Sequence, residues 1–162
     1  MKEQFSEQFA IINEKFTQTF SLLFGGGRAS LYLSDPNNVL ESGIEIEAQP
    51  PGKSLKNLSL LSGGEMAFTA IALLFAILKV RPSPFCMLDE IEAALDEVNV
   101  SRYARYLKNL SDHTQFIAIT HRRGTMEEAD IMYGVTMQEK GVSKLLELDI
   151  SQVESRLGMK SS

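Results

Sequence analysis

The sequence predicts an α/β domain with a mainly parallel central sheet, flanking helices and a small antiparallel β unit. Two short segments, 85–90 and 114–120, are apolar on both faces, which is typical of buried parallel strands. A helical pattern lies between them, and this strand–helix–strand order favours right-handed crossovers. Segments 28–33 and 43–48 have strand character and are separated by a turn, which predicts the antiparallel unit.

Composition places the chain among ordinary globular proteins. It has 162 residues, 44% apolar and 23% charged, with a net charge of -5, so it does not bind nucleic acid simply as a polycation. Its one cysteine, Cys86, lies in an apolar run and is interpreted as packed rather than reactive, which suits a reducing compartment. The longest apolar run is about 13 residues, below the ~20 that span a bilayer, and no signal peptide is visible, so we expect a cytosolic protein.

The first element is predicted to be an amphipathic helix within residues 1–24. Its apolar side chains recur at steps of three and four: Phe5, Phe9, Ile12, Phe16, Phe20 and Leu23. The same spacing suits the last heptads of a coiled coil that enters a globular head. Three glycines, 25–27, are interpreted as a helix stop, since no Gly-Lys-Ser/Thr follows to complete a phosphate loop.

Ser62 and Glu65 have the spacing of a capping box, and they precede an apolar helix over 66–78. Because that helix has almost no polar face, we expect it to be buried on all sides. Gly63 and Gly64 leave backbone amides bare at its positive end, which favours an anion such as phosphate. The alternative is a capped core helix without a ligand.

The remaining elements follow in order. Asp96 is a good N-cap for a helix whose apolar face includes Tyr103 and Tyr106. A short helix is expected at 126–129, and a closing strand pair at 131–137 and 142–148. We expect residues 1–149 to form the domain and residues 150–162 to be a flexible polar tail.

Three polar groups follow the apolar strands: the pair Asp89 and Glu90, then His121. Ligands collect at the carboxyl ends of parallel strands, and adjacent carboxylates there are costly without a partner. Mg²⁺ is the natural partner, with Asp89 reaching it mainly through water. Glu90 is then free to activate a water, and His121 to hold that water or a terminal phosphate. Taken singly, each has a structural alternative, as a turn cap, a solvated neighbour or a satisfied histidine.

The order of these segments resembles the ATPase heads of the ABC superfamily. Residues 61–65 look like the signature motif, 85–90 like Walker B, 94–96 like the D-loop, and His121 like the switch histidine. The flanks resemble the SMC family (structural maintenance of chromosomes), specifically the carboxyl-terminal half of a bacterial SMC head. That similarity runs from about Phe5 to Leu148 and is carried by residues 24–29, 89–96 and 120–126. Glu92 stands where the family often has Asp, which we expect to matter little.

The resemblance implies a function shared between chains. Glu90 and His121 would be catalytic, Asp89 would serve Mg²⁺, and Ser62, Gly63, Gly64 and Asp96 would contact ATP. The phosphate loop would come from the amino-terminal lobe of the head, so the chain alone should neither bind ATP tightly nor hydrolyse it. A second head would dimerise with it through ATP, and DNA would bind through the complete, nucleoid-associated complex for chromosome condensation and partition.

Two other readings stay open. The chain could be a catalytically inert module that docks the winged-helix domain of a kleisin subunit, which the resemblance also implies for this lobe. It could also be the head lobe of another ABC ATPase, from a transporter or a DNA-repair protein, with the same site but different partners. The flanks at 25–29 and 120–126 disfavour that last reading.

Overall fold

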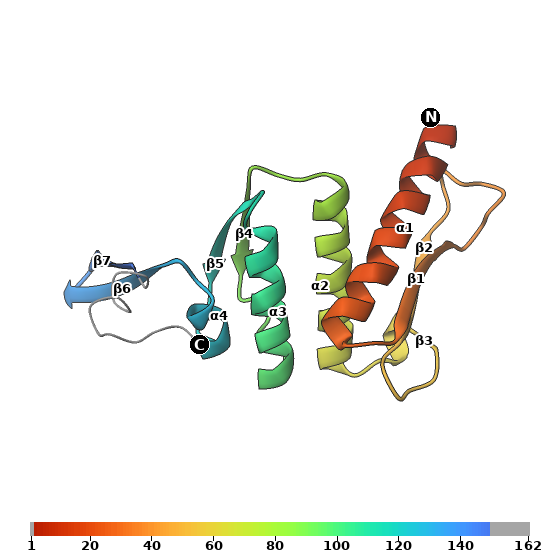
Figure 1. The fold of residues 1–162 in the computed structure, drawn as a ribbon. Coiled ribbons are helices and arrows are strands. Elements are labelled where there is room, and N and C mark those ends of the chain that lie inside the picture. Colours follow the sequence, from red (N-terminus) through yellow and green to blue (C-terminus); the bar gives the residue numbers. More distant parts are fainter. Residues whose placement is uncertain (1, 150–162) are drawn as a thin grey trace.

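The computed structural model describes residues 2–149, which form helices in the middle of the molecule and small sheets around them (Figure 1). The helices are α1 (Lys2–Phe24), η1 (Leu58–Leu60, a 3-10 turn), α2 (Gly63–Val80), α3 (Glu97–Leu110) and α4 (Arg123–Glu127). The strands are β1 (Arg28–Leu33), β2 (Ile44–Gln49), β3 (Lys56–Asn57), β4 (Phe85–Asp89), β5 (Gln115–Ile119), β6 (Ile131–Glu139) and β7 (Val142–Asp149). The predicted tail 150–162 lies outside the described residues.

The α/β class and the small antiparallel unit are confirmed. β1, β2 and β3 form an antiparallel sheet, β4 and β5 pair in parallel from Phe85 opposite Gln115 to Asp89 opposite Ile119, and β6 and β7 form a hairpin. Within residues 2–149 the parallel part therefore has two strands. The helices α1, α2 and α3 stand side by side, with β1 and β2 against α1 and the parallel pair beside α3 (Figure 1).

α1 packs as its apolar stripe predicts. Phe16 and Phe20 are fully buried, and the Asn13 side chain bonds both backbone groups of Leu31, which fixes α1 to β1. The three glycines end the helix with positive φ. Gly27 cannot be replaced there, because a Cβ would lie 2.3 Å from the Gln49 carbonyl oxygen.

The prediction that α2 is buried on all sides is wrong for this chain. Its buried residues fall on one side, while Met66 and Ile77 are exposed. α2 is the one helix within residues 2–149 whose length and apolar composition would allow it to cross a membrane. Its fully buried Phe68 packs against an aromatic ring of α1, and its fully buried Phe75 stacks on two rings of α3, which assigns α2 as a core helix.

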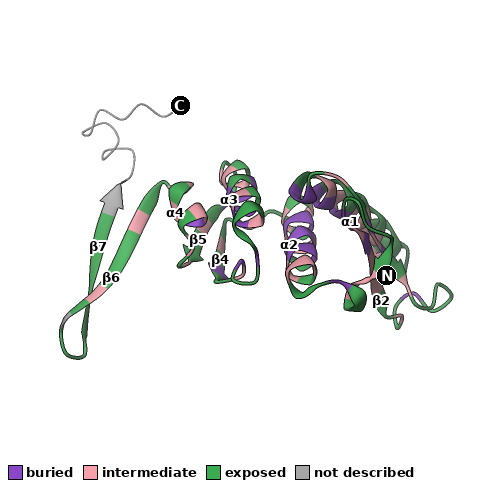
Figure 2. Cartoon of the chain, turned by 90° about the horizontal axis from the view of Figure 1, so that it is seen from below, coloured by how far each residue is buried: buried purple, intermediate pink, exposed green. Residues whose placement is uncertain are grey.

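The prediction that both parallel strands are buried on two faces is also wrong. In β4 Leu88 is buried against the helices, but Phe85 is 58% and Met87 63% exposed. Ile117 and Ile119 of β5 are exposed as well, and the burial colours show this open side (Figure 2). The physical reason is that helices cover only one face of this sheet, so side chains alternate between a packed face and an uncovered one.

The predicted short helix and closing strand pair are both present, as α4 and the β6–β7 hairpin, but their bounds differ from the predicted ones. The hairpin β6–β7 closes at Lys140 and Gly141 as expected, with Gly141 at φ +85. The short helix α4 spans Arg123–Glu127 rather than 126–129, because it starts directly after the His121 turn, where the Arg122 amide donates to the Thr120 hydroxyl. Gly124 there lies against Val100 of α3.

Candidate functional site

The capping box at the start of α2 is confirmed. The Ser62 hydroxyl accepts from the Glu65 amide (3.4 Å), and Glu65 Oε2 accepts from the Ser62 amide (3.1 Å) and hydroxyl (2.8 Å). Lys53 Nζ lies 2.7 Å from Glu65 Oε1, and this hydrogen bond, assisted by those from Ser62, holds the pKa of the Glu65 carboxyl below its usual value. Ser62 and Gly63 are both exposed, so the turn is not inside the core.

The capped turn lies against the loop that follows β4. A Cβ on Gly64 would be 3.1 Å from the carbonyl oxygen of Ala94, whereas a Cβ on Gly63 would meet nothing within 4 Å. Gly64 is therefore a close-approach glycine, and Gly63 faces open space. In Figure 1 β4 runs downward, and the amino ends of α2 and α3 lie at the lower end of the molecule.

Glu90 and His121 are brought together at the carboxyl ends of the parallel strands, 31 residues apart in sequence. Glu90 Oε1 lies 3.3 Å from His121 Nδ1, and both side chains are more than half exposed. Glu90 has φ +47, a conformation that is strained for a residue with a Cβ, and its amide donates to the Ile119 carbonyl (2.9 Å). The fold therefore holds the Glu90 backbone in an unusual conformation and leaves its carboxylate exposed to solvent beside His121.

Asp89 ends β4 with an exposed side chain that has no hydrogen-bond or ion-pair partner among residues 2–149. Within those residues no group of three or more His, Cys, Asp or Glu side chains could hold a metal by itself. A single free carboxylate does fit Mg²⁺, which binds through one or two carboxylates and completes its shell with water and phosphate oxygens. Asp89 is thus suited to a metal that arrives with a nucleotide, rather than to a metal cage built by this chain.

Asp96 serves as the predicted N-cap of α3. Its Oδ1 accepts from the Asn99 amide (2.8 Å), and its Oδ2 accepts from the Asn99 side-chain amide (3.1 Å). The carboxylate remains exposed, on the loop that also carries Ala94. Its capping role is therefore confirmed, and contact with a nucleotide stays a prediction.

Sequence reasoning missed the residues that join the Asp96 loop to the His121 turn. Glu92, where Glu in place of the family's usual Asp was expected to matter little, is 1% exposed, and its Oε1 accepts from the hydroxyls of Thr120 (2.5 Å) and Thr125 (2.9 Å). Arg122 Nη2 donates to the Leu95 carbonyl (2.8 Å) and lies 2.9 Å from Glu97 Oε1. The signal available in the sequence was a carboxylate between apolar residues, which needs partners when buried.

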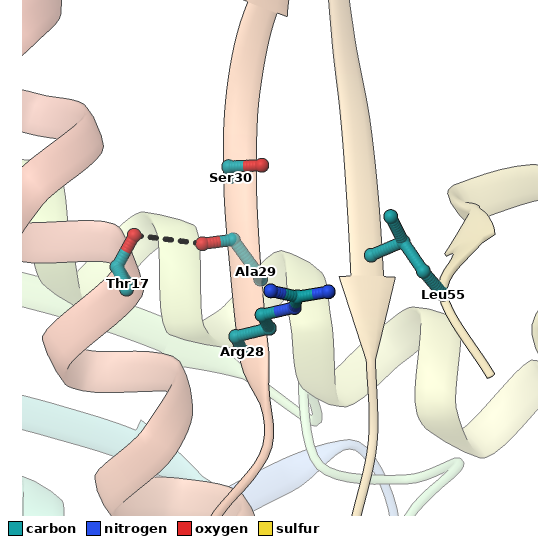
Figure 3. A pocket seen from close by; sticks show the side chains of 5 residues that line it. All are labelled: Thr17, Arg28, Ala29, Ser30 and Leu55. Atoms are coloured by element: carbon teal, nitrogen blue, oxygen red, sulfur yellow. Dashed lines mark hydrogen bonds between the residues drawn. The ribbon is translucent and has the colours of Figure 1, made fainter. Parts of the chain in front are cut away.

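A hollow elsewhere on the molecule does not belong to this site. Its volume is about 310 Å³, and it is lined by Thr17, Arg28, Ala29, Ser30 and Leu55 (Figure 3). The Thr17 hydroxyl donates to the Ala29 carbonyl (2.7 Å), and Arg28 Nε donates to the Gln49 side chain (2.9 Å). Thr17 and Arg28 thus already have partners within the chain, and none of the predicted site residues lines the hollow.

Comparison with known proteins gives related sequences and structures over nearly the whole chain. The chromosome partition protein Smc of Bacillus subtilis (strain 168) is 64% identical over 154 residues, which is 95% of this chain and 13% of that protein. A solved chain from work on the ATP-driven dimerization and DNA-stimulated activation of SMC ATPases is 40% identical, with a TM-score of 0.86 and full coverage of both chains. An Smc head domain from Pyrococcus furiosus, with an extended coiled coil and bound to the C-terminal domain of ScpA, is 43% identical with a TM-score of 0.88, covering 97% of this chain and 39% of that one.

The fold is therefore the mixed α/β fold of an SMC ATPase head. The chain spans only a small part of the chromosome partition protein that it matches, 13% of its length. The family model described as the RecF/RecN/SMC N terminal domain matches residues 3–144. With that match and the full-length structural likeness, the chain belongs to the RecF/RecN/SMC family, and within it to the SMC proteins.

Proposed function

We propose that this chain is the carboxyl-terminal lobe of an SMC ATPase head that acts in chromosome condensation and partition. In this proposal the capped turn at Ser62, Gly63 and Gly64 contacts the γ-phosphate of ATP held by a second head. Asp89, Glu90 and His121 serve the nucleotide of their own head. ATP binding joins the two heads and hydrolysis releases them, in a cytoplasmic, nucleoid-associated complex that reaches DNA as a whole.

The observation that carries the proposal is the close approach of Gly64 to the Ala94 loop, where a Cβ on Gly64 would lie 3.1 Å from the Ala94 carbonyl oxygen. The Ala93 amide in turn donates to the Glu90 carbonyl (3.0 Å), so the anion-binding helix end and the carboxylate pair are linked through one short loop. A helix amino end with bare amides attracts phosphate, and an exposed carboxylate–imidazole pair beside it can handle water. Both kinds of group are therefore available on one edge of the molecule.

The residues of that edge divide the chemistry between them. Bound Mg²⁺ supplies charge neutralisation on the phosphate oxygens, and the free Asp89 carboxylate is the group that would hold it. Glu90 accepts the proton of the attacking water, and His121, 3.3 Å away, orients that carboxylate or contacts the terminal phosphate. Asp96 and the capped turn face the neighbouring head, where their amides and oxygens position its nucleotide.

The uncovered side of the parallel sheet supports the existence of a second lobe. Phe85, Met87, Ile117 and Ile119 expose a contiguous apolar surface on two paired strands. Apolar surface of this kind marks an interaction site. We assign it to the amino-terminal lobe, which would also bring the Gly-x-x-x-x-Gly-Lys-Ser/Thr loop that is absent from this sequence.

Reconstitution with the phosphate-loop lobe tests the proposal. Glu90→Gln should trap ATP-bound dimers and slow hydrolysis by about a hundredfold or more, the usual contribution of a positioned base. Ser62→Arg should prevent dimerisation while sparing nucleotide binding, because it fills the anion site offered to the other head. This chain without that lobe should bind ATP weakly and not hydrolyse it. Equal loss of ATP binding in both variants would contradict the proposed roles.

A second role for the same lobe is docking of a kleisin winged-helix domain. The related Smc head is bound to the C-terminal domain of ScpA, and here the hairpin β6–β7 projects from the body with exposed apolar side chains. Val135 and Leu145 pair across this hairpin, and both are exposed. Its outer edges have no strand partner within residues 2–149, so the hairpin offers both apolar contacts and backbone hydrogen bonds.

The docking role is tested with the C-terminal winged-helix domain of ScpA as the binding partner. Val135→Asp together with Leu145→Asp should weaken binding at least tenfold while leaving ATP-dependent head dimerisation intact. Leu22→Asp is the matched control, since Leu22 is an equally exposed apolar residue on α1, far from the hairpin in Figure 1. Equal binding by the hairpin variant and the control would exclude this surface.

A further inference from the structure

The buried carboxylate of Glu92 is the polar group that the proposed mechanism leaves without a role. It is 1% exposed, yet it lies in the loop between the Asp89–Glu90 pair and Asp96. Taking a carboxylate out of water is costly unless hydrogen bonds compensate. Both compensating donors come from one distant segment, the hydroxyls of Thr120 and Thr125, which act on the same oxygen at 2.5 and 2.9 Å.

These two hydroxyls lie on either side of His121. Thr120 directly precedes the histidine, and its oxygen also accepts from the Arg122 amide (3.0 Å), so it closes the turn that carries His121. Thr125 belongs to α4, which follows the turn. On the other side, Arg122 Nη2 donates to the Leu95 carbonyl (2.8 Å). The turn is therefore joined to the 92–95 loop by side chains both before and after the histidine.

Glu92 lies in a buried part of the molecule, next to buried Thr125. Tyr103 of α3 is fully buried, and its hydroxyl has no hydrogen-bond partner among the described residues. Burial, reinforced by the negative charge of Glu92, raises the pKa of the Tyr103 hydroxyl. Hydrogen bonds in such an environment are stronger than at the surface, and a partly broken network is correspondingly costly.

We infer that Glu92 is a positioning residue: its buried carboxylate accepts from the Thr120 hydroxyl and so holds the His121 turn in register with the Glu90 and Asp96 loop, while the Thr125 hydroxyl anchors the same carboxylate to α4. The inference rests on the proposed function, because it concerns the orientation of the proposed catalytic pair. His121 and Glu90 are exposed and touch each other only through one 3.3 Å contact. The backbone that carries them therefore determines whether the pair stays aligned, and Glu92 is the buried side chain that ties the two backbone segments together beside Arg122.

The test uses the complete protein with both lobes and measures ATP turnover. Thr120→Val removes the hydroxyl at nearly constant volume and should lower kcat by roughly tenfold to a hundredfold, since a 1 Å misplacement of a reacting group costs about a hundredfold. KM for ATP and ATP-dependent dimerisation should stay within about twofold. Thr120→Ser restores the hydroxyl and should recover kcat to within about twofold. Glu92→Gln keeps the side-chain length and removes the carboxylate. It should likewise lower kcat while leaving KM for ATP and dimerisation within about twofold.

Thr125→Val is the matched control, because it removes the other hydroxyl from the same oxygen, on α4 rather than next to His121. It should lower Tm about as much as Thr120→Val and lower kcat clearly less. If Glu92→Gln does not fold, the three threonine variants decide the question. Equal kcat in Thr120→Val and the unmodified protein, or equal kcat loss in both valine variants, would overturn the inference.

Glu90→Gln in the same protein separates this inference from the proposed function. If Glu90→Gln hydrolyses ATP normally, the proposed function fails and the positioning role fails with it. If Glu90→Gln blocks hydrolysis and retains ATP-bound dimers, while Thr120→Val turns over at the unmodified rate, only the role of Glu92 is overturned.

Discussion

The two halves of this molecule handle their apolar residues in opposite ways. In the half made of α1, β1, β2 and α2, side chains such as Phe16 and Phe68 are completely buried among residues of the same chain. In the half made of β4, β5 and the hairpin, side chains such as Met87 and Val135 remain exposed (Figure 2). The first half, together with α3, closes a core within this chain, whereas the second half leaves apolar side chains uncovered.

The position of the proposed site follows this division. The capped turn begins α2, at the border of the closed half, while Glu90 and His121 end the strands of the open half. The contact of Gly64 with Ala94 joins the two halves at the site. The proposed phosphate-binding edge would be completed there by a second surface without disturbing the closed core.

Among the variants that test the difference between the two halves, Phe75→Ala should have the largest effect on stability. Phe75 is fully buried and stacks on Tyr103 and Tyr106 of α3, so its truncation should lower the free energy of unfolding by about 3–5 kcal/mol. Urea denaturation of this chain measures it. Met87→Ala is the control from the open half and should change stability by about 0.5 kcal/mol at most. Similar losses in both variants would remove the distinction between the halves.

The open face should instead show its importance in association. Phe85→Ser combined with Met87→Ser should barely change the stability of this chain and should weaken binding of the phosphate-loop lobe. Full burial of such side chains contributes about 1.5–3 kcal/mol each, so a loss of at least tenfold in affinity per residue is expected. Titration calorimetry between the separately produced lobes measures the loss. Unchanged affinity would show that the lobe packs elsewhere.

At the junction between the halves, we expect alanine substitutions at two neighbouring glycines to differ in their effect on stability. Replacing Gly63 by Ala adds a methyl group in open space and should stabilise the helix by up to about 1 kcal/mol. Gly64→Ala should lose that gain, because its methyl group would press on the Ala94 carbonyl oxygen at 3.1 Å. Thermal unfolding of the two variants should thus differ by about 1 kcal/mol. Equal stability would mean that the turn and the loop are not in contact.

The smallest expected effect concerns the capping box and pH. Because the folded-state pKa of Glu65 is lowered below its ordinary value of 4.5, the ionised carboxylate stabilises the fold above that pH. This contribution is lost as pH falls through the lowered folded-state pKa. Glu65→Gln should therefore cost up to about 1 kcal/mol near neutral pH and progressively less in acid. Lys53→Met should show the same trend, and a cost independent of pH would contradict it.

Local signals predicted most element boundaries correctly. The aromatic stripe of α1 and the glycines that end it depend on helical periodicity and on φ, both of which can be read from neighbouring residues. The capping box at Ser62 and the N-cap at Asp96 likewise depend on residues three positions apart. The start of α4 was missed, because it depends on Thr120 and on packing against α3.

For the site, the sequence predicted the candidate residues, and the tertiary structure showed which of them are in contact and which are buried. An apolar segment in a sequence shows that burial is favourable, but it does not show which face is covered, so α2 and β4 were both predicted to be more buried than they are. The contact between Glu90 and His121 spans 31 residues, and the burial of Glu92 requires Thr120 and Thr125 from another segment.

By itself, therefore, the sequence determined the helix caps, the turns and the order of the polar strand ends, because hydrogen bonding and φ preferences act over a few residues. Only the tertiary structure decided which apolar faces stay open, which glycine touches the neighbouring loop and which carboxylate is buried. Those features depend on contacts between segments that are distant in the chain, and a local sequence pattern does not show which distant segments pack together.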